Sequence, residues 1–136
     1  MTLANSTRSV NERLKSKTEI QGVFVEIELR SQDQVKVIKL RGRLSLGDPV
    51  DRLRSTVEDL VKMGDTRIVL DLAELATVDS SGIGLLTRVL TTTKQQGGSL
   101  KLSSPSKFVV QTLKLVGLIN LFEIFNDTQS AVVSFQ

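Results

Sequence analysis

The chain has 136 residues, 40% hydrophobic and 24% charged, with a formal net charge of +3, which predicts one globular domain with a single core. The absence of Cys and His excludes disulfides, thiolate catalysis, Cys-based zinc sites and a Ser-His-Asp triad. Interspersed charges, no Tyr or Trp, and short apolar runs without a signal-peptide stretch predict a cytoplasmic protein that neither binds nucleic acid nor spans a membrane.

The first part of the chain predicts a tail followed by a hairpin. Residues 1–22 are polar with scattered apolar positions, which predicts a frayed tail or a short docking helix. Residues 23–136 are predicted to form the domain. Alternating apolar residues over 23–29 predict a strand, and 35–44 predict a second strand paired with it across a turn at 31–34.

Helices and strands alternate through the rest of the chain. Asp48 and Pro49 predict a cap and a first helical residue, and Gly64 ends that helix. The remaining predicted elements are strands over 67–72, 99–102 and 121–125, and helices over about 80–96, from a cap at Ser104 to Gly117 with Val116 inward, and from a cap at Asp127 through Val132. The order ββαβαβαβα predicts a single α/β domain with a mixed, mostly parallel sheet and packed helices.

Binding sites in such sheets form in the loops at the carboxyl ends of the strands. Three loops follow predicted strands in this way: 45–48, 76–82 and 103–104. We expect the three loops to share one edge of the sheet.

The second of these loops contains the most informative stretch, Asp79-Ser80-Ser81-Gly82-Ile83-Gly84. Asp and Ser are good N-caps, whereas each glycine costs a helix about 1 kcal/mol relative to Ala. The helix start is therefore bare and flanked by hydroxyls, and it tolerates added negative charge. One interpretation is structural, with capping by Asp79 and Ser80 and tight packing at the glycines. The other is a functional surface.

This string resembles the STAS domain, and most of all the bacterial anti-sigma factor antagonists. Gly42-Arg43-Leu44 and Gly97-Gly98 also match, and the element order agrees from about Val23 to Phe135. The resemblance implies a regulator that binds an anti-sigma factor in its unmodified form and thereby frees a sigma factor. It implies that the anti-sigma factor, acting as a serine kinase, phosphorylates Ser81, with Ser80 a weaker candidate, and that a serine phosphatase reverses the modification.

The predicted partner-binding surface combines two loops and the helix start. Its residues are Ser45, Asp48, Asp79, Ser80, Gly82, Ile83 and Gly84. The family often carries Asp where this chain has Ser45. That departure is either a simple turn replacement or a change in kinase or partner preference, and the sequence leaves both interpretations open.

The sequence does not favour an enzyme and predicts no cofactor. The Gly-x-Ser-x-Gly elbow and the Gly-Lys-Ser/Thr phosphate loop are absent, and Thr87 stands where a dinucleotide fingerprint needs its third glycine. The carboxylates of Asp71, Glu74 and Asp79 suggest a Mg²⁺ site, but scattered carboxylates are more often solvated surface. The alternative functions are weak nucleotide binding, as in some relatives, and a scaffold role in a stressosome or as an accessory subunit of a transporter.

Overall fold

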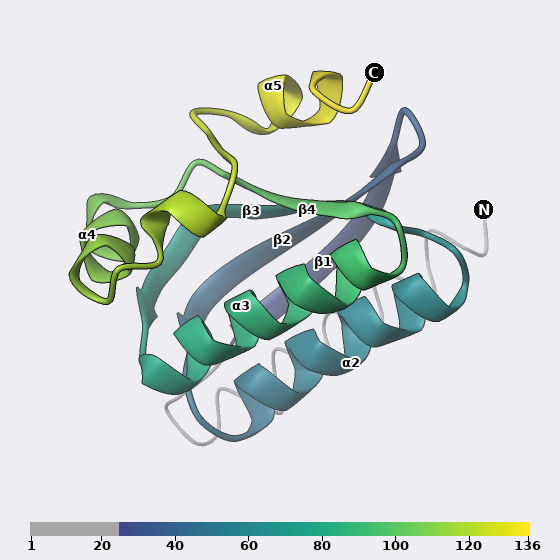
Figure 1. Ribbon diagram of the computed structural model, residues 1–136. Coiled ribbons are helices and arrows are strands. Elements are labelled where there is room, and N and C mark those ends of the chain that lie inside the picture. The colour runs from purple at the N-terminus through teal and green to yellow at the C-terminus, as the bar shows by residue number, and fades with distance from the viewer. Residues whose placement is uncertain (1–24) are drawn as a thin grey trace.

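The computed structural model of the chain describes residues 25–136 and contains one five-stranded sheet (Figure 1). The predicted tail over 1–22 and the first two residues of the predicted strand, 23 and 24, lie outside the described residues. The sheet order follows the chain: β1 (Val25–Gln32), β2 (Val35–Leu44), β3 (Arg67–Val78), β4 (Ser99–Ser103) and β5 (Ile124–Phe125). The β1–β2 pair is antiparallel and the other pairs are parallel, which confirms the predicted mixed α/β fold.

The hairpin between β1 and β2 closes through a two-residue turn at Asp33 and Gln34. Both residues have positive φ, 52° and 65°, as a type I′ turn requires. The turn fixes the register in which Gln32 pairs with Val35 and Val25 pairs with Gly42. The register directs Val25 and Ile27 into the core, where Val25 is fully buried.

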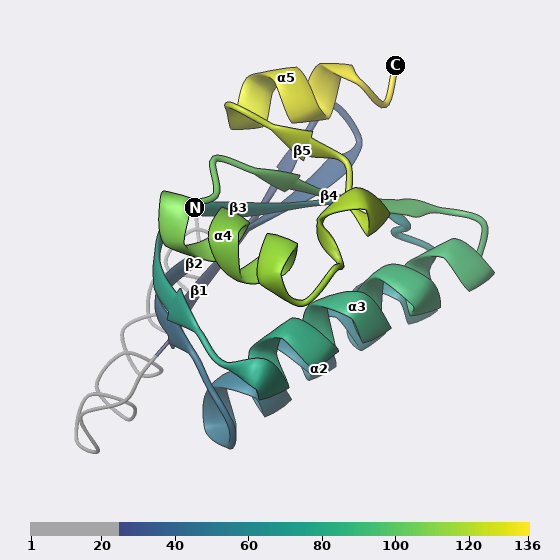
Figure 2. The ribbon, with the colours of Figure 1, turned by 60° about the vertical axis from the view of Figure 1, so that its left-hand side comes forward.

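The helices are α2 (Asp48–Lys62), α3 (Ser80–Gln95), α4 (Lys107–Leu115) and α5 (Thr128–Val133). Because the strand order never reverses, crossovers of one hand place α2, α3 and α4 on the same face of the sheet. Figure 2 shows these three helices on one side of the strands and α5 on the other. No helix within residues 25–136 combines the length and the apolar composition that crossing a membrane requires.

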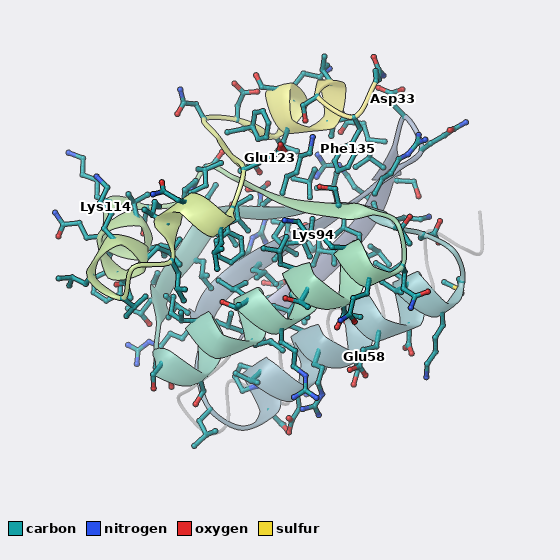
Figure 3. The ribbon with its side chains drawn as sticks, in the orientation of Figure 1. Asp33, Glu58, Lys94, Lys114, Glu123 and Phe135 are labelled. Atoms are coloured by element: carbon teal, nitrogen blue, oxygen red, sulfur yellow. The ribbon has the colours of Figure 1, made fainter. Side chains whose placement is uncertain are left out.

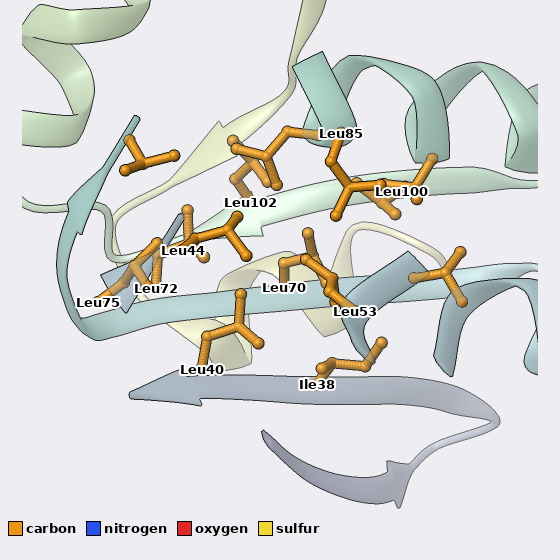
Figure 4. Packing of buried hydrophobic residues seen from close by; sticks show 14 of the residues in the cluster. Ile38, Leu40, Leu44, Leu53, Leu70, Leu72, Leu75, Leu85, Leu100 and Leu102 are labelled. Carbon is orange, nitrogen blue, oxygen red and sulfur yellow. The ribbon is translucent and has the colours of Figure 1, made fainter. Parts of the chain in front are cut away.

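The main core lies between the sheet and the three crossover helices. Figure 4 shows Leu53 of α2 and Leu85 of α3 beside Leu70 of β3 and Leu100 of β4. Fully burying a side chain of this size stabilises a fold by about 1.5–3 kcal/mol. Four leucines near the carboxyl ends of β2 and β3 extend this core toward one corner of the sheet: Leu40, Leu44, Leu72 and Leu75.

A smaller core lies under α5 on the opposite face. Ala131 and Val132 of this helix pack over Val35, Val37 and Val69 of the central strands.

Lys101 of β4 is buried beside this smaller core, with an exposed fraction of 7%. Its ammonium donates to Ser134 Oγ at 2.7 Å, lies 3.3 Å from Glu123 Oε1 and sits 4.2 Å from the centre of the Phe135 ring. Figure 3 labels Glu123 and Phe135 on the α5 side of the sheet. The lysine therefore ties the C-terminal segment to a central strand.

The third strand is longer than predicted. It continues past Leu72 to Val78, and this extension pairs only with β2, through two register shifts, whereas its pairing with β4 stops at Asp71 and Ser103. The shifts interrupt the alternation of buried and exposed residues that marks a strand in the sequence. The extension carries the start of α3 to the corner where β2 ends.

Three other element boundaries and the orientation of one residue differ from the predictions. Gly47 is the N-cap of α2 and Asp48 is already helical, while α4 is capped by Ser106 instead of Ser104. Val116 is 52% exposed and does not face inward. The strand predicted over 121–125 is a 3-10 turn, η1 (Ile119–Leu121), followed by the two residues of β5.

Candidate functional site

The start of α3 is organised by the carboxylate of Asp79. This residue is the N-cap, and its Oδ1 accepts a hydrogen bond from the Gly82 amide at 2.9 Å. The carbonyl of Asp79 accepts from the Ile83 amide at 2.9 Å, which begins the helical ladder. The predicted capping by Asp79 is confirmed, and the cap uses neither serine hydroxyl.

The same carboxylate also holds the loop between β2 and α2. The Leu46 amide donates to Asp79 Oδ2 at 3.0 Å, although the two residues are 33 positions apart. The Asp79 amide in turn donates to the Leu44 carbonyl at 3.2 Å. The predicted site segments 45–48 and 79–84 therefore meet at one corner of the sheet.

The two serines follow the cap directly. Ser80 is exposed and Ser81 is half-buried, and both belong to the first turn of α3. Because the amides of this turn carry a positive partial charge, a negative group added to either hydroxyl is electrostatically tolerated by the helix.

The two glycines of the string have different roles. Gly82 is buried, and a Cβ built on it would lie 2.6 Å from the Leu44 carbonyl oxygen and 2.5 Å from Val78 Cγ2. Its lack of a side chain therefore lets α3 pack on the strand ends. Gly84 is exposed, and a Cβ added to it would meet nothing within 4 Å, so it presents bare backbone to the surroundings.

The other predicted contact residues are not equally accessible. Ile83 is 4% exposed and belongs to the main core, so its side chain does not face a partner. Asp48 is exposed and lies 3.9 Å from Arg52 in a weak i,i+4 pair. Ser45 is half-buried, and its Oγ is enclosed without a hydrogen-bond partner.

The loop at 103–104 leaves the same edge of the sheet as the other two loops, as predicted, because β2, β3 and β4 are parallel. It does not join the corner that 45–48 and 79–84 form. β4 ends where Ser103 pairs with Asp71, and β3 runs on to Val78 before α3 begins. Ser103 is fully buried and bonds Thr128 of α5 at 2.8 Å, so it belongs to the opposite face.

Leu46 is the exposed residue that sequence reasoning missed. Its side chain is 76% exposed, and its backbone amide is held by the Asp79 carboxylate. An apolar residue between Ser45 and a glycine-aspartate turn was visible in the sequence. Its position beside α3 was not visible, because a long-range hydrogen bond creates it.

The carboxylates considered for Mg²⁺ are each engaged elsewhere. Asp71 Oδ1 accepts from the Ala73 amide at 3.1 Å, and Asp79 holds the two amides described above. Glu74 lies 2.9 Å from both Lys39 Nζ and Arg41 Nε. The hydrogen bond from Lys39, with the nearby Arg41 charge, lowers the pKa of Glu74 below its ordinary value. Within residues 25–136 no three potential metal ligands gather.

Comparison with known proteins points to one family. The model of the STAS domain family matches residues 26–131. The anti-sigma-B factor antagonist of Bacillus subtilis is 26% identical over 110 residues, which is 79% of this chain and 97% of that protein.

Solved structures share the fold at low identity. The phosphorylated form of the Bacillus cell fate determinant SpoIIAA superposes with a TM-score of 0.66 at 22% identity, covering 81% of this chain and 99% of that one. A sulfate transporter family protein from Wolinella succinogenes gives a TM-score of 0.67 at 19% identity, covering 77% of this chain and 87% of that one.

Proposed function

The chain belongs to the STAS domain family, and we propose that it is an anti-sigma factor antagonist switched by phosphorylation of Ser81. In this proposal the unmodified protein binds an anti-sigma factor and so frees a sigma factor. The observation that carries the proposal is the helix start itself: Asp79 satisfies the cap, and Ser81 is therefore available for modification beside an exposed surface. The curated relative with the name of anti-sigma-B factor antagonist supports it.

The proposed switch is local. A phosphate would add about −1.5 to −2 charges and three acceptor oxygens in the first turn of α3. The helix tolerates this charge at its N-terminus, so the fold remains. The phosphate would stand beside the exposed Asp79 carboxylate and add to its negative charge. A docked partner would then clash with the bulky group, and its own negative groups would be repelled by both charges. Modification would therefore block binding without unfolding the domain.

The partners follow from this cycle. The anti-sigma factor would be a serine kinase that uses ATP, and a separate serine phosphatase would restore the binding form. The chain itself would supply the acceptor hydroxyl and the docking surface, with no catalytic group of its own. This division fits a site whose central carboxylate, that of Asp79, is occupied in holding two backbone amides.

Phosphate mapping tests the acceptor. Purified anti-sigma-type kinases of the source bacterium are incubated with ATP and with wild type, Ser81→Ala or Ser80→Ala protein, and the products are analysed by mass spectrometry. We expect one phosphate on Ser81 in wild type and in Ser80→Ala, and none in Ser81→Ala. Phosphate on Ser80 in wild type would reject the assignment.

The likeness to a sulfate transporter family protein favours a second candidate, a scaffold or accessory module, because that protein shares the fold at a similar TM-score. A further alternative function, nucleotide binding by the same loops, can be tested directly. Titration of ATP and GTP into the isolated protein should give no heat of binding if the main proposal holds. Saturable binding that Gly84→Arg abolishes would favour the nucleotide-binding module.

A further inference from the structure

The corner of the sheet where segments 45–48 and 79–84 meet is called the docking corner below. It contains one strongly exposed apolar side chain, that of Leu46. Single exposed apolar residues are common on protein surfaces and need no explanation by themselves. Leu46 differs because the backbone on both sides of it is fixed. Leu44 before it is fully buried, and Pro49 after it is buried at the start of α2.

Three hydrogen bonds set the path of this loop. Asp79 accepts from the Leu46 amide at 3.0 Å, the Leu44 carbonyl accepts from the Asp79 amide at 3.2 Å, and the Gly47 carbonyl accepts from the Asp51 amide at 3.0 Å. Gly47 has φ of 103°, a conformation that favours glycine. The loop is therefore tied to both neighbouring helices, and its path holds the Leu46 side chain away from the core.

We propose that Leu46 is the apolar anchor with which this corner binds its anti-sigma partner, and that Asp79 is the positioning residue that presents it. The inference rests on the proposed function and adds the residue that provides apolar contact. The other exposed residues at this corner are polar or glycine: Gly47, Asp48, Asp79, Ser80 and Gly84. Leu46 is therefore the exposed apolar contact there, and the occupant is a protein with an apolar pocket for it. Interfaces of this kind bury a few central apolar side chains inside a polar rim.

Asp79 links the anchor to the switch. One oxygen of its carboxylate holds the helix turn that contains Ser81, and the other holds the amide of Leu46. A partner that takes Leu46 into a pocket is thereby brought against the first turn of α3. A phosphate on Ser81 would then stand inside the contact area.

Calorimetric titration of the kinase that phosphorylates Ser81 tests the anchor. We expect Leu46→Ala to weaken binding about tenfold or more. Leu46→Met, which keeps a large apolar side chain, should bind nearly as wild type does. Met63→Ala is the matched control, because Met63 is 70% exposed at the far end of α2 and should bind as wild type does.

Asp79→Asn tests the positioning role. An Asn caps helices well, but it places an NH2 group where one carboxylate oxygen stood. Because the Leu46 and Gly82 amides donate to different oxygens of Asp79, one of them would lose its acceptor. We expect weaker binding by a variant that stays folded, with a melting temperature lowered only modestly by the loss of one hydrogen bond. In the double variant Asp79→Asn/Leu46→Ala the losses should be less than additive, since both act through the same side chain.

The outcomes separate the two proposals. Binding of Leu46→Ala within twofold of wild type, or fully additive losses in the double variant, would overturn the anchor while leaving the switch at Ser81 standing. If no anti-sigma-type kinase binds or phosphorylates the wild-type protein, the proposed function fails, and the anchor fails with it.

Discussion

At the scale of single residues, the carboxylate of Asp79 shows how much one side chain can organise. The sequence predicted it as a cap, because Asp before a bare helix start is a common N-cap. Its second hydrogen bond, to the Leu46 amide, could not be predicted, since no periodic pattern relates positions 46 and 79. The motif thus predicted the helix start, whereas the contact between Asp79 and the distant loop could be seen only in the folded structure.

Two glycines in the same turn predict opposite effects of one substitution. Gly82→Ala would place a Cβ against the Leu44 carbonyl and Val78, and should lower the free energy of unfolding by roughly 1–3 kcal/mol. Gly84→Ala would place its Cβ in open space and should raise the free energy of unfolding by up to about 1 kcal/mol, because Ala has the higher helix propensity. Urea denaturation measures both. Equal effects of the two substitutions would contradict the packing role of Gly82.

The ion pairs of Glu74 predict an acid-dependent contribution to stability. Lys39 and Arg41 lower its pKa in the folded state, so the contribution is present above the ordinary carboxyl pKa and is lost as the pH falls through the folded-state value. Glu74→Gln should therefore reduce the loss of stability between about pH 6 and pH 3, measured by urea denaturation. An NMR titration that places the Glu74 midpoint at or above 4.5 would contradict this account.

At the scale of elements, the sequence predicted the order of strands and helices because most apolar residues follow one clear period. The exception is the second half of β3. Its residues 73–78 pair with β2 through register shifts, so buried positions recur irregularly.

Ser104 was mistaken for a helix cap because serine favours several roles. It instead has φ of 55° and donates to the Asn126 carbonyl at 3.0 Å.

The short helix α5 depends on contacts outside itself, because six residues are too few for an isolated helix. Lys101→Ala would remove the buried stem and the hydrogen bond to Ser134, and should cost about 2 kcal/mol. Hydrogen exchange should then become faster for the amides of α5 and stay unchanged for those of α2. Unchanged protection of α5 would show that Lys101 does not hold this helix.

At the scale of the whole molecule, the sheet separates two surfaces. The helices α2 and α3 and the Ser81 corner belong to one side, and α5 with its small core belongs to the other (Figure 2). This separation could be predicted in part, since strands that follow the chain order place crossover helices on one face. The assignment of α5 to the opposite face depends on tertiary packing that its short sequence does not specify.

This separation predicts that phosphorylation stays a local event. Amide chemical shifts should change around 45–47 and the first turns of α3 when Ser81 is phosphorylated. The amides of Val35, Val69 and Val132, in the small core under α5, should keep their shifts. Changes spread across both faces would indicate a rearrangement of the domain instead of a local block.

The central claim is that the unmodified corner binds an anti-sigma factor and that phosphate on Ser81 prevents binding. The most direct measurement is calorimetric titration of the purified anti-sigma kinase with unmodified protein, with protein phosphorylated on Ser81, and with Ser81→Glu. We expect the phosphorylated form to bind about 100-fold more weakly or worse, and Ser81→Glu to be intermediate because it carries less charge. Equal affinities of the unmodified and phosphorylated forms would contradict the claim.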